Sequence, residues 1–459
     1  MIQLRDYQQT AIEAVRAQFR AGKRSVLMVM PTGAGKTVAF SYVTQGAQTL
    51  GKRVWLLAHR IELVEQISET LKQFGVHHGF IAAGYRQNPS RLAQVASVQT
   101  LVRRTQSHHA PDLIVVDEAH HATAKNTIGT ILKAYPRARV LGVTATPVRL
   151  SGEGLGETFN SMVLGPTVQE LIDAGALSPV TIYAPPTMDT SLLHLRAGEF
   201  IHSEVSALVD KPKITGSAVE HYKRLADKKR AVAFCVSVDH ARNVAAEFTR
   251  AGYSAMYVDG SMERASRKDA VSRFKEGKIH VLTSCDLISE GFDCPGIEVG
   301  ISLRPTASLG LWLQQVGRCL RVFEGKDRAT ILDHAGNTLR HGLPTDDREW
   351  SLEGRERSTR ATKDDAALAV RVCPQCFSAD KSGKPACVHC GHVYPIAGRK
   401  LTEVEGELKE IKAVNPKRRE QGQAQSVEAL TELAVMRGYS NPRKWAEYVY
   451  KGRMAKRRA

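Results

Sequence analysis

The sequence contains no apolar run that approaches the length of a membrane span. Its first residues, Met1 to Arg5, also lack the charged and apolar regions of a secretory signal peptide. Acidic residues are scarce beside basic ones, since 47 Asp and Glu stand against 64 Lys and Arg, for a formal charge of +17. We therefore expect a cytoplasmic protein without membrane contact that binds a polyanion, most simply nucleic acid.

Cysteine is sparse as well, and half of the eight residues form two pairs. Cys373 and Cys376 make one C-x-x-C pair, and Cys387 and Cys390 make a second pair ten residues later. In a cytoplasmic chain such pairs favour a metal site over disulfides, and two separate redox pairs are the alternative. Four thiolates from two turns suit tetrahedral Zn²⁺. We expect a small zinc-ribbon-like module at residues 372–394.

Short apolar runs typical of strands alternate with helical segments over the first 340 residues. The strand-like runs are Ser25–Met30, Arg53–Ala58, Val95–Val98, Leu113–Val116, Val140–Thr144, Ala231–Val236, Ala255–Val258, His280–Ser284, Val299–Leu303 and Ala329–Leu332. This alternation predicts an α/β fold whose parallel sheets are covered by helices on both faces. Clustered glycines and prolines at 152–190 interrupt the pattern and predict a boundary between two similar domains.

We therefore expect five parts along the chain. They are a first α/β domain, a second α/β domain, a charged and solvated linker, the cysteine module, and a basic linker with a helical tail, at residues 1–178, 179–345, 346–371, 372–394 and 395–459. A ribbon this small buries little core, so the module is expected to stand apart as a metal-stapled knob. The aromatics and cations of the tail could bind nucleic acid, or the aromatics could pack inward in a helical hairpin.

A glycine-rich turn follows the first strand, in the stretch Met30-Pro31-Thr32-Gly33-Ala34-Gly35-Lys36-Thr37. A strand, such a turn and a helix beginning near Lys36 are the context of a phosphate loop. The turn, with Thr32, Gly33 and Gly35, would aim backbone N–H groups at a polyphosphate. Lys36 would reach the β- and γ-phosphates of ATP, and the Thr37 hydroxyl would bind Mg²⁺. A turn that merely closes a βα unit is the alternative.

Two carboxylates follow the all-apolar run Leu113–Val116, in Asp117-Glu118-Ala119-His120. The carboxyl end of a buried parallel strand is where α/β sheets hold ligands. Asp117 would therefore hold Mg²⁺, and Glu118 would orient and activate the attacking water. The alternative is a helix start with acidic residues in its first turn.

The second domain contributes an arginine-rich stretch, Gln314-Gln315-Val316-Gly317-Arg318-Cys319-Leu320-Arg321. On one helix, Gln314, Arg318 and Arg321 would share a face at positions i, i+4 and i+7. Two guanidiniums aimed across a cleft can stabilise the charge of a transferring phosphoryl group, although a surface salt-bridge face is the alternative. ATP is then expected between the two domains.

Together these motifs resemble the superfamily 2 helicases and translocases of the Asp-Glu-Ala-His type over residues 1–340. Within that superfamily the chain resembles the bacterial RadD proteins and related phage helicases, on the stretches Phe80-Ile81-Ala82-Ala83-Gly84, Ser302-Leu303-Arg304-Pro305-Thr306 and Ile331-Leu332-Asp333-His334-Ala335-Gly336-Asn337. The resemblance implies two RecA-like domains and a monomer that acts on DNA in repair, recombination or replication. It also implies single-strand-binding protein or a recombinase as partners, near the nucleoid of a bacterial or phage-infected cell.

The same resemblance assigns roles to further residues. It implies that Gln8 reads adenine, and that Gly291 and Asp293 face the nucleotide. It also implies that the nucleic-acid backbone is contacted by His59, Arg60, Gln99, Thr100 and Thr283. Coupling of hydrolysis to domain movement is implied for His120, Thr144 and Thr146. An RNA helicase stays open, because these motifs read a backbone and not the sugar. An ATP-switched nucleic-acid-binding scaffold is the second alternative.

Overall fold

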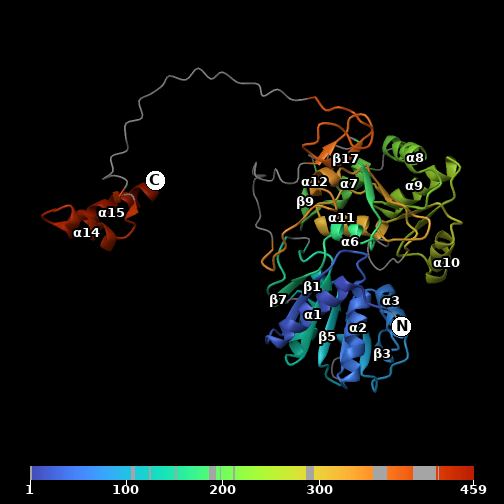
Figure 1. The fold of residues 1–459 in the computed structure, drawn as a ribbon, viewed down its shortest axis with the longest axis horizontal. Helices are drawn as coiled ribbons and strands as arrows, with labels where there is room; N and C mark the ends of the chain where they lie inside the picture. Colours follow the sequence, from blue (N-terminus) through green and yellow to red (C-terminus); the bar gives the residue numbers. More distant parts are fainter. Residues whose placement is uncertain are drawn as a thin grey trace. The chain divides into compact units, whose positions relative to one another are not determined.

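The computed structural model describes residues 3–104, 109–123, 126–149, 152–185, 193–196, 198–209, 212–285, 294–354, 370–395, 420–421 and 423–458. They belong to two compact units, Met1–Pro395 and Ile396–Ala459 (Figure 1). The first unit contains two lobes, each built on its own sheet. None of the helices in these ranges combines the length and the hydropathy that a membrane crossing needs.

Lobe 1 is a seven-stranded sheet in the order β3-β4-β2-β5-β6-β1-β7. Every neighbouring pair is parallel, which confirms the sheet type expected from the alternating pattern. The strands are β1 Ser25–Val29, β2 Val54–Ala58, β3 His78–Ile81, β4 Ala93–Ser97, β5 Leu113–Asp117, β6 Arg139–Thr144 and β7 Ser161–Leu164. The two edge strands, β3 and β7, were not among the predicted runs, because their apolar stretches are short and half-exposed.

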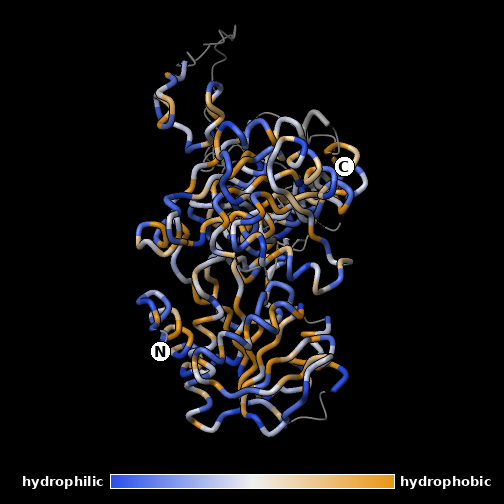
Figure 2. Tube along the Cα trace, turned by 90° about the vertical axis from the view of Figure 1, so that its right-hand side faces the viewer, coloured by the Kyte–Doolittle hydropathy of each residue, from blue (hydrophilic) through white to orange (hydrophobic). Residues whose placement is uncertain are grey.

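Helices cover both faces of this sheet (Figures 1 and 2). They are α1 Asp6–Arg20, α2 Lys36–Thr49, α3 Ile61–Gln73, α4 Val98–Leu101, α5 Thr127–Ala134 and α6 Val168–Asp173, with a 3-10 turn, η2, at Ala119–His121. Side chains of β1 alternate between the faces, so that Met28 packs with Phe40 of α2 while Leu27 packs in the cluster of Ile131 of α5. Strand β1 is therefore buried along its whole length, as its nearly continuous apolar run predicts.

Lobe 2 is an eight-stranded sheet in the order β12-β13-β11-β14-β15-β8-β17-β16. Its strands are β8 Val180–Tyr183, β11 Ala231–Phe234, β12 Ala255–Val258, β13 Val281–Ser284, β14 Val299–Ser302, β15 Ala329–Asp333, β16 Val370–Val372 and β17 Ser378–Lys381. Its helices are α7 His202–Val209, α8 Pro212–Ala226, α9 Val238–Arg250, α10 Arg264–Lys275, α11 Leu309–Cys319 and α12 Asn337–His341, and β9 Leu195–Arg196 pairs with β10 Glu199–Phe200 in a separate ribbon. The neighbouring pairs of this sheet from β12 to β8 are all parallel, and the pairs β8–β17 and β17–β16 are antiparallel.

The cysteine module is therefore part of the sheet of lobe 2, and the expected separate knob is wrong. Strand β17 pairs with β8 through Ser378 and Ala379, and the Phe377 carbonyl accepts a hydrogen bond of 2.8 Å from the Ala184 N–H. Both paired residues are buried. Without β17, the edge of β8 would present unpaired backbone groups, which is why a short antiparallel addition is favourable there.

The stretch after α12 also differs from the expected solvated linker. Residues 346–354 pack within the first unit, with Trp350 against the main core cluster and Leu352 against the second cluster of lobe 1. These two apolar residues stand among charged ones in the sequence, so the composition of the stretch does not indicate that they are packed. Residues 355–369 of the predicted linker lie outside the described ranges.

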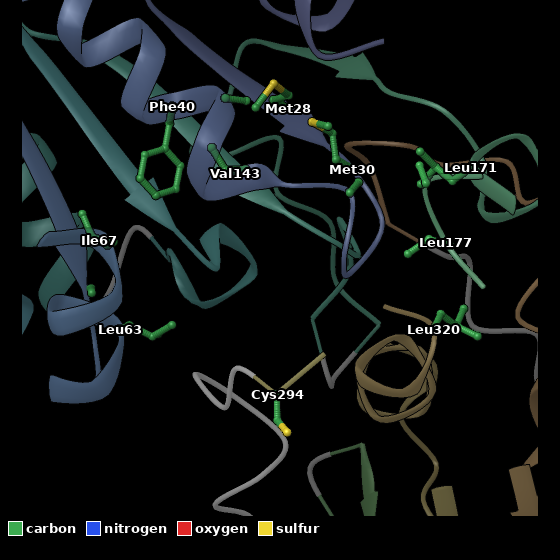
Figure 3. Close-up of a cluster of buried hydrophobic side chains, with 14 of the residues drawn as sticks. Met28, Met30, Phe40, Leu63, Ile67, Val143, Leu171, Leu177, Cys294 and Leu320 are labelled. Carbon is green, nitrogen blue, oxygen red and sulfur yellow. The ribbon is translucent and has the colours of Figure 1, made fainter. Parts of the chain in front are cut away.

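Apolar packing continues from lobe 1 into lobe 2. Figure 3 shows Met30 of lobe 1 in one region with Leu171 and Leu177 and with Leu320, which follows α11. An ion pair of 2.7 Å between Arg267 of α10 and Glu62 of α3 adds a second contact between the lobes. The two lobes thus meet along their carboxyl edges, where the candidate site residues lie.

The second unit contains a helical hairpin formed by α14 Val427–Met436 and α15 Pro442–Arg458. Its small core consists of Leu430, Leu433, Ala434 and Ala446, which are buried. Tyr439 stacks on Trp445 with ring centroids 5.0 Å apart. Tyr448, by contrast, is 81% exposed. The expected inward packing of aromatics therefore describes the Tyr439–Trp445 pair but not Tyr448.

Candidate active site between the lobes

The phosphate-loop candidate joins β1 to α2, and α2 begins at Lys36 as the sequence predicts. Gly33 and Gly35 have φ angles of 90° and 80°, a region that favours glycine. Space is limiting too, because a β-carbon on Gly33 would lie 2.8 Å from Cδ2 of Leu177. The N-terminus of α2, with Thr37 in its first turn, directly follows this sharp turn, so its backbone N–H groups are available to an anion.

Lys36 is held inside this loop. Its Nζ donates a long hydrogen bond of 3.4 Å to the Met30 carbonyl. Burial lowers the pKa of Lys36, whereas the nearby Glu118 and Asp117 carboxylates raise it. A bond of that length is weak, so an incoming phosphate can replace the carbonyl as the partner of the ammonium.

Asp117 and Glu118 lie at the carboxyl end of β5, and both are buried. Burial raises the pKa of Asp117 to about 7, Glu118 adds to the rise, and Lys36 opposes it. The backbone of Glu118 has a φ of 47°, which is uncommon for a non-glycine residue and is often found at functional sites. Asp117 would supply the hard carboxylate oxygen that suits Mg²⁺, and the ion would offset the negative charge of both carboxylates and of the phosphates.

Helix α11 of lobe 2 crosses directly over the phosphate loop. A β-carbon on Gly317 would lie 2.5 Å from Cβ of Thr32, so only glycine permits this approach. Gln314 and Arg318 are both buried on this helix. Arg318 is therefore placed next to the loop by a contact between the two lobes.

The prediction that Arg321 shares the face of this helix is wrong, because α11 ends at Cys319. Arg321 instead lies in a short bridge with Leu177. It nevertheless approaches the loop, since its Cγ is 3.5 Å from the position of a β-carbon on Gly33. Burial lowers the pKa of Arg321 to about 10, which leaves the guanidinium charged at neutral pH.

Lys326 supports this arrangement and was not recognised from the sequence. Its Nζ donates to the carbonyls of Cys319 and Arg321 at 2.5 and 2.7 Å. A lysine at the carboxyl end of a helix satisfies carbonyls that have no partner within the helix. The backbone that carries Arg321 is thereby fixed from a second side. A basic residue a few positions after the helix end is the only sequence signal for this role.

The three residues predicted to couple hydrolysis to domain movement lie in one chain of contacts. His120 Nδ1 is 3.4 Å from Oε2 of Glu118 and 3.0 Å from Oγ1 of Thr144. The Thr144 hydroxyl donates to the Thr146 carbonyl at 2.9 Å. Thr146 in turn faces Gly310 of α11, where a β-carbon would lie 3.0 Å from its Oγ1. The contacts run from the carboxylate in lobe 1 to the arginine helix in lobe 2.

A second chain of contacts leads from the same carboxylate to the predicted nucleic-acid residues. The ring of His121 lies 4.1 Å from that of His120 and 4.6 Å from that of His59, measured between centroids. Gln99 donates to the His59 carbonyl at 2.9 Å. His59, Arg60 and Thr100 are partly exposed and Gln99 is exposed, so these two loops can reach a bound strand.

The prediction that Thr283 contacts nucleic acid does not fit its position. Thr283 is fully buried in β13, and its hydroxyl donates to the Ala241 carbonyl at 2.7 Å. A side chain enclosed and hydrogen-bonded inside the lobe cannot reach a strand. Gly291 and Asp293, predicted to face the nucleotide, lie outside the described ranges.

Gln8 contacts the phosphate loop itself. Its Nε2 donates to the carbonyls of Ala34 and Gly35 at 3.1 and 3.4 Å, and its Oε1 accepts from the Arg5 N–H at 3.0 Å. Beside it, a groove of about 820 Å³ is lined by Arg5, Tyr7 and Pro166, among others, and not by Gln8. The assignment of Gln8 to adenine stays a prediction.

The four paired cysteines come together, with their Sγ atoms all within 4.8 Å of one another. Cys373 and Cys390 are 3.6 Å apart, and Cys376 and Cys387 are 3.7 Å apart. These distances are far longer than a disulfide of about 2.05 Å. Four ligands at about 2.3 Å from a tetrahedral zinc would be about 3.8 Å apart. The geometry therefore fits a Cys₄ zinc site.

Comparison with known families gives two matches that divide the chain as the two sheets do. The family described as "Type III restriction enzyme, res subunit" matches residues 1–149. The family described as "Helicase conserved C-terminal domain" matches residues 214–323. These ranges contain the phosphate loop and the arginine helix, respectively.

Curated relatives and solved structures agree with these matches. A 51.5 kDa protein of a Lactococcus phage is 33% identical over 83% of this chain and 81% of its own length. The putative ATP-dependent helicase IRC3 of Saccharomyces cerevisiae is 31% identical over 72% of this chain, which spans only 51% of that protein. Two solved structures share the fold. A fragment of a putative HsdR subunit of a type I restriction enzyme from Vibrio vulnificus has a TM-score of 0.58 and 23% identity, and the likeness covers 74% of this chain and 65% of that chain. The Type ISP restriction-modification enzyme LlaBIII bound to DNA has a TM-score of 0.54 and 18% identity, and the likeness covers 72% of this chain and 27% of that chain.

This chain has two tandem RecA-like lobes, matches two helicase-related families and has helicases among its relatives. The chain therefore belongs to the superfamily 2 helicases and is an ATP-dependent helicase.

Proposed function

We propose that the chain is a RadD-like, Asp-Glu-Ala-His-type motor that translocates on DNA, or separates its strands, in repair, recombination or replication. The observation that carries this proposal is the contact of Gly317 with Thr32, which brings the arginine helix of one lobe onto the phosphate loop of the other. ATP bound at that contact would touch both lobes, so its hydrolysis would change how they are held together.

The positions of the side chains support the roles that we propose for them. Lys36 and the glycine turn would bind the phosphates, and Thr37 with Asp117 would hold Mg²⁺, which would neutralise phosphate charge. Glu118 orients the attacking water, and Arg318 and Arg321 meet the charge that develops on the γ-phosphoryl group. Gln314 lies on the same helix one turn before Arg318 and would contribute a polar group to the site.

DNA is the proposed nucleic acid. The formal charge of +17 favours a polyanion without choosing between DNA and RNA. The choice of DNA rests on the resemblance to the RadD proteins and is supported by the match of residues 1–149 to the family described as "Type III restriction enzyme, res subunit". Single-strand-binding protein and a recombinase are the partners that the RadD likeness suggests.

The test is the rate of ATP hydrolysis with single-stranded, duplex and forked DNA and with RNA of equal length. We expect DNA to stimulate hydrolysis more than RNA does, with single-stranded or branched forms acting best. Greater stimulation by RNA would favour an RNA helicase instead. ATP binding without stimulated turnover on any ligand would favour the nucleic-acid-binding scaffold.

Zinc is the proposed metal of the cysteine module, and purified protein should hold one Zn²⁺ per chain. Replacement of both Cys373 and Cys376 by serine should abolish zinc binding, because two of four thiolates are lost. The matched control is Cys235→Ser, which changes a buried cysteine outside the cluster and should leave the zinc content unchanged. Metal analysis of reduced, folded protein decides, and a preparation without zinc would contradict the assignment.

A chain that ends at Pro395 should keep its basal ATP hydrolysis but bind a labelled DNA strand more weakly. The first compact unit, which ends there, contains the whole proposed ATP site and the cysteine module. The lost segment carries cations beside the exposed Tyr448, which could stack on a base. Fluorescence anisotropy over a salt series measures the effect.

The truncated protein should show a shallower dependence of affinity on salt, because fewer phosphate contacts release fewer counterions. Equal affinities and equal slopes would show that the hairpin does not touch DNA. A chain cut before residue 370 is not an equivalent test, because it also loses β17 and exposes the edge of β8.

A further inference from the structure

Residues Leu343–Gly354, which we name the strap, leave lobe 2 after α12 and end on lobe 1. At the lobe 2 end, Arg348 fixes the direction of the chain by donating to the carbonyls of His341 and Leu343 at 2.9 and 3.0 Å. A carboxylate of Asp346 also accepts the Leu343 N–H at 2.7 Å. These bonds make the start of the strap an extension of lobe 2.

The lobe 1 end of the strap is a contact between two backbones. The Gly156 N–H donates to the Leu352 carbonyl at 2.8 Å, and Glu153 bridges to Gly354. A β-carbon on Gly154 would lie 2.0 Å from the Leu352 oxygen, and one on Gly354 would lie 2.5 Å from the Gly154 nitrogen. Contacts this short exist only because both positions are glycine, so the seat for the strap is specific.

Between its two ends the strap closes one side of a cavity of about 120 Å³. The other walls include the phosphate loop, through Pro31 and Thr32, helix α11, through Gly317, and the segment at 164–168 of lobe 1. Arg348 and Trp350 supply the wall on the strap side. The strap thus lies against the same junction at which the arginine helix meets the phosphate loop.

We propose that the strap is a positioning segment that holds α11 against the phosphate loop before ATP binds. The idea rests on the proposed ATP site between the lobes. Because the strap joins the lobes by a second route beside the chain at 165–179, it reduces the freedom that the lobes would lose on closing around ATP. ATP then binds a site that is already assembled. Its apparent affinity is proportional to the fraction of chains in the closed state, so a larger closed fraction gives a lower apparent Kd.

Displacing the strap should therefore raise the KM for ATP and spare kcat. Gly154→Ala places a methyl group on the Leu352 carbonyl and should raise both KM and the Kd of a fluorescent, non-hydrolysed ATP analogue about tenfold, if a tenth of the chains stay closed. At saturating ATP, kcat should stay within about twofold, since ATP itself draws the lobes together. The matched control is Gly216→Ala in α8, where a β-carbon meets nothing within 4 Å.

Trp350→Ala is the second variant, because it weakens the strap without adding strain at the glycine seat. It should change Kd and KM in the same direction, and it decides the question if Gly154→Ala does not fold. Unchanged Kd and KM in a folded variant whose strap has become sensitive to protease would overturn the proposal. So would a loss confined to kcat. The wild-type turnover rate reports separately on the proposed function, because the analogue titration needs no hydrolysis.

Discussion

Lys36→Ala should lower kcat for ATP hydrolysis about 10²–10³-fold, the usual effect of removing one charged or hydrogen-bonding group from a transition state. The Lys36 ammonium lies inside the glycine turn and beside Glu118 and Asp117. Without it, the β- and γ-phosphates would meet two carboxylates and no compensating lysine. The defect should therefore appear in nucleotide binding as well as in turnover.

Binding of a labelled DNA strand without nucleotide should stay within about twofold in the same variant. The residues predicted to contact DNA in lobe 1 belong to the loops of His59 and Gln99, which lie apart from the phosphate loop in the sheet order. Lys52→Ala is the matched control, because Lys52 is an exposed lysine of lobe 1 that pairs with Asp112 on the surface. Near-normal turnover in Lys36→Ala would contradict the assignment of the phosphate loop.

Features that depend on local sequence could be predicted. The start of α2 at Lys36 and the buried strand before Asp117 follow from a glycine turn and from a continuous apolar run, both of which act within a few residues. The same holds for the pairing of the cysteines, because ligand spacing limits where a tetrahedral site can form. In each case the sequence signal and the structure lie within one element or turn.

Features that depend on distant contacts could not be predicted. Thr283 resembles a motif residue, but the packing of α9 on β13 places its hydroxyl against Ala241. Arg321 has the sequence spacing of a helix face, but its backbone forms a bridge with Leu177, which is 144 positions away in the sequence. Neither partner has a local signal in the sequence.

The glycines at 152–156 indicate an irregular segment in the sequence, but they do not indicate what that segment contacts. Gly152, Gly154 and Gly156 belong to the glycine and proline cluster that predicts a boundary between the domains. Two of them instead permit a close backbone contact with the strap. Glycine is equally suited to a mobile loop and to close approach, so composition alone cannot separate the two. The partner, around Leu352, lies nearly 200 residues further along the chain.

The attachment of β17 to β8 changes what the cysteine module can do. A knob on a linker could move ahead of the motor, but a module hydrogen-bonded into the sheet must move with lobe 2. Metal loss would therefore act on the stability of lobe 2 as well as on the module, because a metal that orders a small fold contributes to its folding free energy. The hairpin of the second unit is the better candidate for an independent contact with DNA.

Arg318→Ala should lower kcat about 10³-fold or more and leave the Kd for ATP within about threefold, as expected of an arginine that meets developing charge. Arg318 is buried, and the approach of Gly317 to Thr32 sets its distance from the phosphates. In the ground state Lys36 and the glycine turn would already bind the phosphates under the proposed assignment. The guanidinium therefore contributes mainly when charge spreads over the γ-phosphoryl oxygens.

Steady-state kinetics beside titration with a non-hydrolysed ATP analogue separates these two contributions. Arg318→Lys is the informative second variant, because it keeps a positive charge but loses the planar fork, and it should recover only part of the rate. Arg250→Ala, in the last turn of α9 in the same lobe, is the matched control, since Arg250 is an exposed arginine that pairs with Glu247. A variant whose loss lies wholly in Kd, with normal turnover once saturated, would place Arg318 outside the transition-state contacts. Arg321 would then be the remaining arginine that could act on the transferring group, because its side chain also reaches the phosphate loop from lobe 2.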